Sequence, residues 1–370
     1  MRNWFAILVT MLLLCLLTPL RAGAEAEIPV LLTEANTGCV LHEEHADLRV
    51  EPGSLAKLMT AYLTAQAIQR GELAPDTVLT AGESVRGMQG AVVWLEPGDR
   101  MTVDELLLSL LVGNANDAAA VLADAVSGDA AQFVMDMNAA AFDLGMRDTR
   151  FTTPQGFDDP ASCTTAQDLG RLACAVLRTP QLTPYVTTWR TFVKDGAAEL
   201  VNENTLTRTL DGCRGLKASH AGRRYSLIAA AEKNGLVCAA IVLNCTDPDE
   251  RFSRAKSLLR EGFTGNKLAA PGYAEEFLVP LKIRGGTEQA VLLELSHLPV
   301  LAVPKSAELT SVTVLPEYRQ APVRRGEQVG TVYFYRGETL LAQSALCAAA
   351  DVPRISFRAA WGKVRHVLFS

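Results

Sequence analysis

The pattern of apolar and polar residues divides the chain into two regions of different secondary structure. Before about residue 264, an apolar pair of strands around a turn at 36–38 is followed by long helical patterns, and two more apolar strands precede a charged helix. After about residue 264, short runs in which apolar and polar residues alternate dominate the pattern. In the first region, helices are expected at 54–69, 102–126, 130–144 and 249–262, and strands at 28–32, 39–41, 225–231 and 237–243.

The second of these helical patterns carries a start signal and a polar interruption. Thr102 and Glu105 have the spacing of a capping box, which predicts the first turn of the helix. The polar run Gly-Asn-Ala-Asn-Asp-Ala at 113–118 interrupts an otherwise apolar stretch, and polar groups at buried helix positions need partners. Two interpretations remain open, a capped helix break or a functional cluster.

The C-terminal part is predicted to hold a small β domain and a final helix. After a Pro-Gly break at 266–272, residues 273–352 show short strands separated by Gly and Pro. Residues 353–370 place four apolar side chains on one helical face between basic residues. A basic amphipathic helix of this kind can lie on an anionic membrane surface, although it could also dock on its own domain.

The N-terminus has the pattern of a secretory signal peptide. A basic start, an apolar core from Phe5 to Leu17 and small residues at 22–24 predict cleavage after residue 24 and export. The alternative, a membrane-spanning anchor, would need a longer apolar run than this one. We therefore expect a signal peptide at 1–24 and a mature domain of mixed helices and strands at 25–264.

Composition and charge exclude several classes of protein. With 49% hydrophobic and 21% charged residues, the chain is neither disordered nor collagen-like. Its net charge of -6 argues against a nucleic-acid partner. The cysteines form no C-x-x-C pair and have no histidine at ligand spacing, so no metal site is predicted.

Ser54 and Lys57 are the first candidates for chemistry. Because they are three residues apart at the start of an apolar helix, the hydroxyl and the amine share one face. A desolvated Lys57 could take the Ser54 proton, and the helix N-terminus could stabilise an oxyanion. A second Ser-x-x-Lys at 253–256 lies in a highly charged helix and is predicted to be solvated surface.

Lys217 and Ser219 lie just before a predicted strand. A lysine at a strand edge beside a nucleophile can hold a substrate carboxylate, although a single lysine is more often a surface residue.

The order and spacing of the three motifs resemble those of the serine D-alanyl-D-alanine carboxypeptidases, the low-molecular-mass penicillin-binding proteins. Their signature is Ser-x-x-Lys, Ser-x-Asn and Lys-Thr-Gly, here matched by Ser54 to Lys57, Asn114 to Asn116 and Lys217 to Ser219. Segments at 32–38, 96–107, 153–156, 202–204 and 321–330 are also similar to family segments, so the resemblance covers nearly the whole mature chain.

The resemblance implies an α+β fold of the penicillin-binding and β-lactamase type, with an antiparallel sheet flanked by helices, then the β domain and an amphipathic helix. It implies that Ser54 attacks the terminal peptide bond of peptidoglycan stem peptides, with no cofactor or metal, and that β-lactams act as covalent inhibitors. Lys57 would be the base, Asn116 would bind the substrate amide, and Lys217 the terminal carboxylate. The amides of Ser54 and of the strand near Ser219 would form the oxyanion hole.

The sequence departs from the family pattern at two motifs. Asn114 stands where the family has Ser, and Ala218 and Ser219 stand where it has Thr and Gly. An amide cannot relay a proton through one rotating hydroxyl, so turnover could be reduced. Besides the active carboxypeptidase, two alternatives follow: a catalytically weakened relative that binds peptidoglycan or a partner as a scaffold, and a β-lactamase or related esterase.

Overall fold

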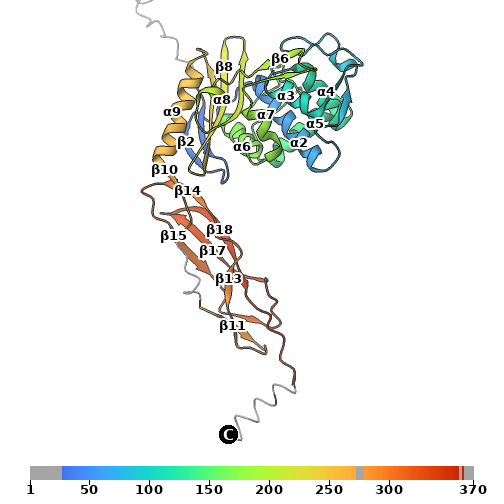
Figure 1. Ribbon diagram of the computed structural model, residues 1–370. Coiled ribbons are helices and arrows are strands. Elements are labelled where there is room, and N and C mark those ends of the chain that lie inside the picture. Colours follow the sequence, from blue (N-terminus) through green and yellow to red (C-terminus); the bar gives the residue numbers. More distant parts are fainter. Residues whose placement is uncertain (1–26, 272–278, 358–360, 362–370) are drawn as a thin grey trace, which may run out of the picture.

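A computed structural model describes residues 27–271, 279–357 and 361 of the chain. Figure 1 shows a mixed helix and strand part, followed by an elongated part built of strands. The predicted signal peptide at 1–24 and most of the predicted terminal helix at 353–370 lie outside the described residues. The domain bounds proposed from the sequence stay predictions.

A five-stranded antiparallel sheet forms one side of the first part. The predicted N-terminal hairpin is confirmed. One of its strands pairs with the later of the two predicted strands, at 236–245, which in turn pairs with the earlier one at 224–233, so both ends of this region meet in one sheet. In spatial order the strands are β2 (Val40–Glu44), β1 (Val30–Glu34), β9 (Leu236–Cys245), β8 (Arg224–Lys233) and β7 (Cys213–Ala221).

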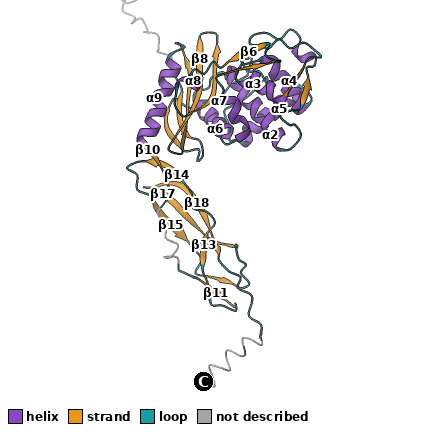
Figure 2. Cartoon of the chain, in the orientation of Figure 1, coloured by secondary structure: helices purple, strands orange, loops and turns teal. Residues whose placement is uncertain are grey.

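Alternate strand residues point to opposite sides of the sheet, so both faces carry apolar side chains. Helices cover each face and bury these side chains. Val30, Leu227 and Val242 face helix α9 (Glu250–Gly265), which contributes three apolar side chains to the same cluster. The neighbouring residues in register, among them Leu31 and Ile228, face helix α6 (Ala166–Leu177) and the helices beyond it. Figure 2 shows this arrangement, with α9 on the outer side of the sheet.

The helical layer is built around α2 (Lys57–Gln69), which is buried along most of its length. The helix expected at 102–126 forms as two helices, α3 (Val103–Leu111) and α4 (Asn116–Ser127), because the polar run breaks it at 112–115. The capping box at Thr102 and Glu105 is confirmed. Helix α5 (Ala130–Asp143) follows, close to its predicted bounds.

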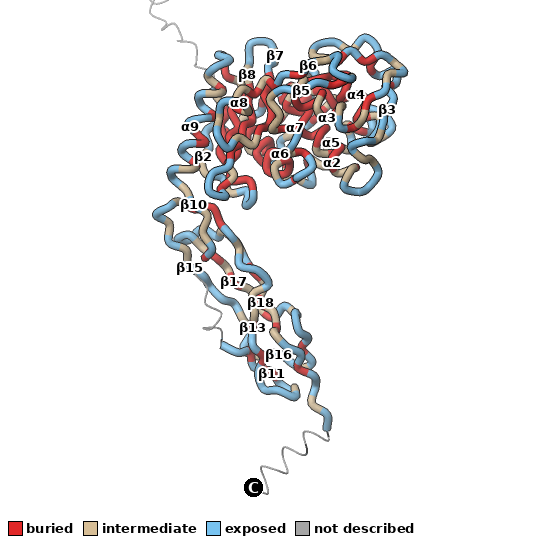
Figure 3. Tube along the Cα trace, in the orientation of Figure 1, coloured by how far each residue is buried: buried red, intermediate tan, exposed pale blue. Residues whose placement is uncertain are grey.

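Shorter elements complete this part. The first of them, η1 (Gly53–Ala56), forms the start of the helix expected at 54–69, and the sequence patterns did not predict the others. These others are β3 (Val78–Thr80), η2 (Glu83–Val85), β4 (Arg100–Thr102), η3 (Pro180–Leu182), α7 (Thr183–Thr187), β5 (Arg190–Val193), β6 (Ala198–Val201) and α8 (Leu206–Thr209). The burial map of Figure 3 shows the buried core continuing from the sheet into the helical layer.

The second part is all β over residues 279–352, as the alternation predicted. A four-stranded sheet has the order β13 (Leu293–Leu295), β18 (Thr339–Ala348), β17 (Gln328–Arg336), β15 (Thr310–Val314), and a three-stranded one has β12 (Ala290–Val291), β11 (Leu281–Arg284), β16 (Tyr318–Gln320). The segment expected to be a break instead contains β10 (Asn266–Ala269), which follows α9 directly and pairs with β14 (Leu301–Pro304).

No single helix within the ranges given above is long and apolar enough to cross a membrane. Helices α4 and α5 satisfy the length and composition test only as a pair bent by 82°.

Candidate active site

Ser54 is half-buried in the 3-10 turn η1, which leads directly into α2. The turn begins at Gly53 with φ +51°, a conformation that favours glycine. Gly156 packs against it so closely that a Cβ added to Gly156 would lie 1.9 Å from the Gly53 carbonyl oxygen. Two glycines therefore let two main-chain segments meet beside the candidate nucleophile.

Lys57 begins α2 one turn after Ser54 and is only 1% exposed. Its Nζ donates a 2.9 Å hydrogen bond to the main-chain carbonyl of Gln155. Burial, reinforced by the charge of Lys217, holds the pKa of Lys57 well below its ordinary value, while Glu203 opposes the shift. The neutral amine, which is the form able to accept a proton, is thereby favoured.

Asn114 lies in the break between α3 and α4 and contacts the nucleophile. Its Nδ2 donates to Ser54 Oγ at 3.3 Å, and its φ of 59° is a left-handed conformation that asparagine tolerates better than most residues. The Oδ1 atom is buried and has no hydrogen-bond partner among the residues that the structure describes. Because Ser54 Oγ accepts from Asn114, its own hydrogen is free to point elsewhere in the site.

Asn116, at the start of α4, holds the loop that forms one wall. Its Nδ2 donates to the carbonyl of Gln89 at 2.6 Å, and its main-chain N–H donates to Ala91 at 2.7 Å. The adjacent Asp117 is 1% exposed, and its carboxylate accepts from the N–H groups of Val93, Leu95 and Ala118. The polar run of the sequence thus both breaks the helix and ties residues 89–95 to the site.

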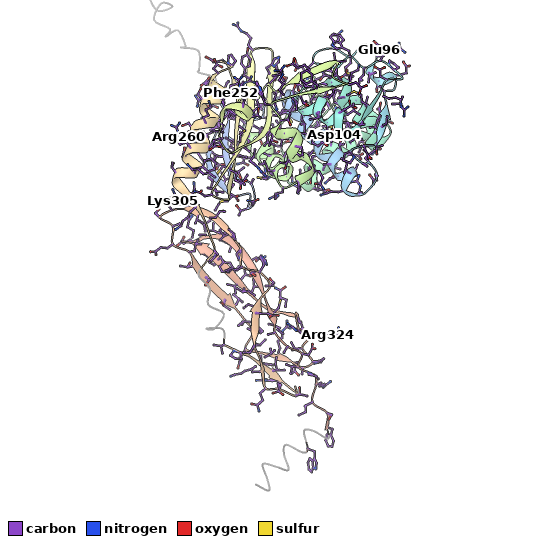
Figure 4. The ribbon with its side chains drawn as sticks, viewed as in Figure 1. Glu96, Asp104, Phe252, Arg260, Lys305 and Arg324 are labelled. Atoms are coloured by element: carbon purple, nitrogen blue, oxygen red, sulfur yellow. The ribbon has the colours of Figure 1, made fainter. Side chains whose placement is uncertain are left out.

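Lys217 and Ser219 are buried on edge strand β7. Lys217 Nζ donates to the carbonyl of Leu111 at 3.4 Å, and burial lowers its pKa to about 8, against an upward effect of Glu203. Ser219 Oγ lies against Gly53, since a Cβ on that glycine would approach it to 2.9 Å. The Ser219 carbonyl accepts a 2.7 Å hydrogen bond from Arg251 of α9, which fixes this edge of the sheet. Phe252, labelled in Figure 4, follows Arg251 on that helix.

A cavity of about 470 Å³ opens above Ser54. Of the residues singled out from the sequence, Ser54, Asn114 and Asn116 line it, whereas Lys57 and Lys217 are buried and Ser219 lines an adjoining cavity. Sequence reasoning left open whether His220, which also lines the cavity, joins the site, and it assigned no role to the other lining residues, which are Gly53, Gln89, Gly90, Ala91, Gln155, Gly156, Phe157, Asp158 and Glu203. The only signal for some of them was that the segments 153–156 and 202–204 resembled family segments.

The arrangement suits nucleophilic chemistry by a serine. A hydroxyl at a helix start, a buried amine on the same side and a main-chain strand edge are the parts that acyl transfer needs. No group of three or more His, Cys, Asp or Glu residues within the described part of the chain could hold a metal ion.

Comparisons with known proteins give a consistent result. The family described as "D-alanyl-D-alanine carboxypeptidase" matches residues 21–247, and "Penicillin-binding protein 5, C-terminal domain" matches residues 278–354. A Bacillus subtilis relative named D-alanyl-D-alanine carboxypeptidase DacF is 27% identical, over 90% of this chain and 87% of its own length.

Solved structures agree with these matches. The chain is similar to penicillin binding protein 5 from Haemophilus influenzae, with a TM-score of 0.78, 25% identity and coverage of 88% of this chain and 97% of the other. It is also similar to ampicillin-bound penicillin-binding protein D2 from Listeria monocytogenes, with a TM-score of 0.58, 28% identity and coverage of 64% and 96%. The expected fold class is confirmed for the α+β part and the β domain.

Proposed function

Because the chain belongs to the D-alanyl-D-alanine carboxypeptidase family and is a serine peptidase of cell-wall biogenesis, we propose that Ser54 is its nucleophile. Ser54 Oγ attacks the carbonyl carbon between the two terminal D-alanines of a peptidoglycan stem peptide. The terminal D-alanine leaves with the proton taken from Ser54, and water then hydrolyses the acyl ester. The observation that carries this assignment is Ser54 at a helix start, beside a buried Lys57 whose neutral form is favoured.

Lys57 is the proposed base, and Asn114 orients the nucleophile. The lysine amine takes the Ser54 proton during attack and returns it to the leaving nitrogen. The hydrogen bond from Asn114 to Ser54 Oγ supports this direction of transfer, because it occupies an acceptor position of the oxygen and leaves the O–H to donate toward an amine. Asn114 therefore performs a positioning role that does not need the hydroxyl found in the family motif.

Substrate binding is assigned to the strand edge and to the wall opposite it. We propose that Lys217 attracts the terminal carboxylate, that Asn116 Oδ1 accepts from the substrate amide, and that the N–H groups of Ser54 and of the strand near Ser219 bind the oxyanion. Ser219 contributes through the backbone that Arg251 fixes. A β-lactam places its strained carbonyl at the same oxyanion position, so we propose that these antibiotics acylate Ser54 as well.

The assignment predicts a bell-shaped dependence of kcat/KM on pH. Lys57 must be neutral to act as base, so activity rises with pH through its lowered pKa. Lys217 must be charged to attract a carboxylate, so activity falls again as pH rises through about 8. D-alanine release measured between roughly pH 5 and pH 10 checks both limbs. If kcat/KM for D-alanine release kept rising well above pH 8, the assignment of Lys217 to carboxylate binding would be wrong.

The activity itself is tested with the mature protein and a stem pentapeptide ending in D-Ala-D-Ala. The expected result is release of one D-alanine per peptide, together with a fluorescent-penicillin adduct that peptide mass spectrometry locates on Ser54. If the folded protein releases no D-alanine across this pH range, the proposed carboxypeptidase activity is wrong. The alternative, a scaffold that binds peptidoglycan or a partner, then replaces it.

For location, we propose that the protein is exported and held at a membrane surface by residues 353–370. The described residues of this segment support the proposal, because Phe357 and Trp361 are 85% and 62% exposed and their rings stack at 6.5 Å, as apolar side chains one helical turn apart. The mature chain is expected to sediment with vesicles containing anionic lipid, and a chain ending at residue 352 is expected to stay in solution. Equal sedimentation of the two chains would rule out this anchor.

A further inference from the structure

Glu203 is a charged residue of the cavity for which the proposed mechanism has no use. It lies between β6 and α8 and lines the Ser54 cavity together with His220. Its Oε1 is 3.8 Å from His220 Nδ1. Its Oε2 is buried and has no hydrogen-bond donor, and no Lys or Arg nitrogen is within 4.0 Å of the carboxylate, within the residues that the structure describes.

The carboxylate of Glu203 has few direct partners in the free protein. One oxygen has lost water without gaining a protein donor, while the side chain as a whole stays 35% exposed on the cavity side. The nearby amines are engaged elsewhere, because Lys57 and Lys217 both donate to main-chain carbonyls. A cation entering the cavity therefore meets a carboxylate that, within the described residues, has no Lys or Arg nitrogen in direct contact.

The negative charge of Glu203 disfavours the binding of an anionic group at this wall of the cavity. Glu203 acts on both site lysines, since it raises the pKa of Lys57 and of Lys217 against the effect of burial. Its field thus extends to the place where the substrate is held. A second substrate carboxylate on this wall would be repelled, whereas an ammonium group could bind Glu203 Oε1 in a charge-assisted hydrogen bond.

We propose that Glu203, with His220 beside it, is a specificity site that binds a primary ammonium group of a peptidoglycan stem peptide. The inference rests on the proposed function, because a stem peptide carries such a group on the side chain of its diamino acid. The ammonium has two possible sources: the diamino residue of the peptide being cleaved, or that of a second stem peptide entering the cavity after the acyl ester has formed.

The first experiment uses two donor peptides that differ by one acetyl group. Nα-acetyl-L-Lys-D-Ala-D-Ala keeps the ε-ammonium, and Nα,Nε-diacetyl-L-Lys-D-Ala-D-Ala lacks it. For the mature protein we expect kcat/KM to be about tenfold higher with the free amine, mainly through KM, as one charge-assisted hydrogen bond would give. In Glu203→Gln the ratio of the two values is expected to fall to about one, and Glu203→Asp is expected to recover part of it.

Asp158→Asn is the matched control, because Asp158 is an exposed carboxylate of the same cavity. It is expected to keep the ratio seen in the unmodified protein. If Asp158→Asn lowered the ratio of the two kcat/KM values as much as Glu203→Gln does, the overall negative charge of the cavity opening would select the amine. That result would overturn the proposal. Fluorescent-penicillin labelling of Ser54 shows that each variant is folded with a working nucleophile.

The second experiment separates the two sources. The diacetylated donor is turned over in the presence of Nα-acetyl-L-Lys-D-Ala, which supplies an amine but no cleavable D-Ala-D-Ala bond. If the second peptide is the source, its ammonium group first gives one proton to water. The neutral amine then attacks the acyl carbon, the C–O bond to Ser54 breaks, an amide forms, and the second proton from the attacking nitrogen passes through Lys57 to Ser54 Oγ. The joined product is then expected with the unmodified protein, and at about tenfold lower yield with Glu203→Gln.

A Glu203-dependent effect in either experiment supports the proposal, and the experiment that shows it identifies the source. Release of D-alanine with no dependence on Glu203 in either experiment overturns the specificity site and leaves the proposed function standing. Absence of D-alanine release from all peptides overturns the proposed function instead.

Discussion

Replacement of Ser54 by Ala is expected to abolish D-alanine release, with a loss of at least about 10⁴-fold in kcat. The reason is that Ser54 Oγ is the atom that forms the acyl ester, and the cavity lining supplies no second hydroxyl or thiol to replace it. The fluorescent-penicillin adduct should disappear in the same variant. Both losses are measured on protein whose thermal unfolding matches that of the unmodified chain, since removing one half-buried hydroxyl leaves η1 and α2 intact.

The chain offers a matched control for this variant. Ser253 begins a second Ser-x-x-Lys motif, and both it and Lys256 are exposed on α9. Ser253→Ala should leave D-alanine release and labelling unchanged, because an exposed Ser-x-x-Lys has neither a desolvated amine nor an oxyanion site. If Ser54→Ala retained a penicillin adduct at another residue, the assignment of the nucleophile would be wrong.

Replacement of Lys57 by Met is expected to slow acylation by about 10²–10⁴-fold, the usual contribution of a general base. Methionine has nearly the length of lysine and no charge, so it should fill the same buried space and lose only the hydrogen bond to the Gln155 carbonyl. The acid limb of the pH profile should also disappear, because the group that titrates there has been removed.

Rapid-mixing measurement of penicillin acylation over a range of pH checks both parts of this prediction. Lys256→Met on the exposed face of α9 is the control and should behave as the unmodified protein does. Retention of the acid limb in Lys57→Met would mean that another group accepts the Ser54 proton.

The sequence predicted best those features that depend on local patterns. Period-two and period-3.6 runs located four of the five sheet strands and most long helices, because burial of one face imposes those periods wherever an element packs on a core. The polar run at 113–118 was recognised as a break or a functional cluster. The break is confirmed, because the run ends α3, and it also places Asn114 against Ser54.

Features that depend on packing between distant segments were out of reach. Glu203 is 149 positions after Ser54 in the chain, and only the approach of the β6 to α8 connection places it in the same cavity. Ser219 was predicted from its place beside Lys217, but its hydroxyl contacts Gly53, and its carbonyl is held by Arg251 from the opposite helix. Side-chain direction at a strand edge is decided by such neighbours, which no pattern along the chain reveals.

The connection between the two parts is made of paired strands and shared core rather than a free loop. Helix α9 ends at Gly265, and β10 begins at the next residue; Lys305 N–H donates to the Gly265 carbonyl at 2.9 Å, and Ala302 of β14 is buried in the cluster beneath α9. A joint made of paired strands and shared core resists bending far better than a loop would. If the proposed membrane attachment of residues 353–370 holds, the β part would act as a spacer of fixed length, and the stem peptides within reach would be those in one thin layer of the wall.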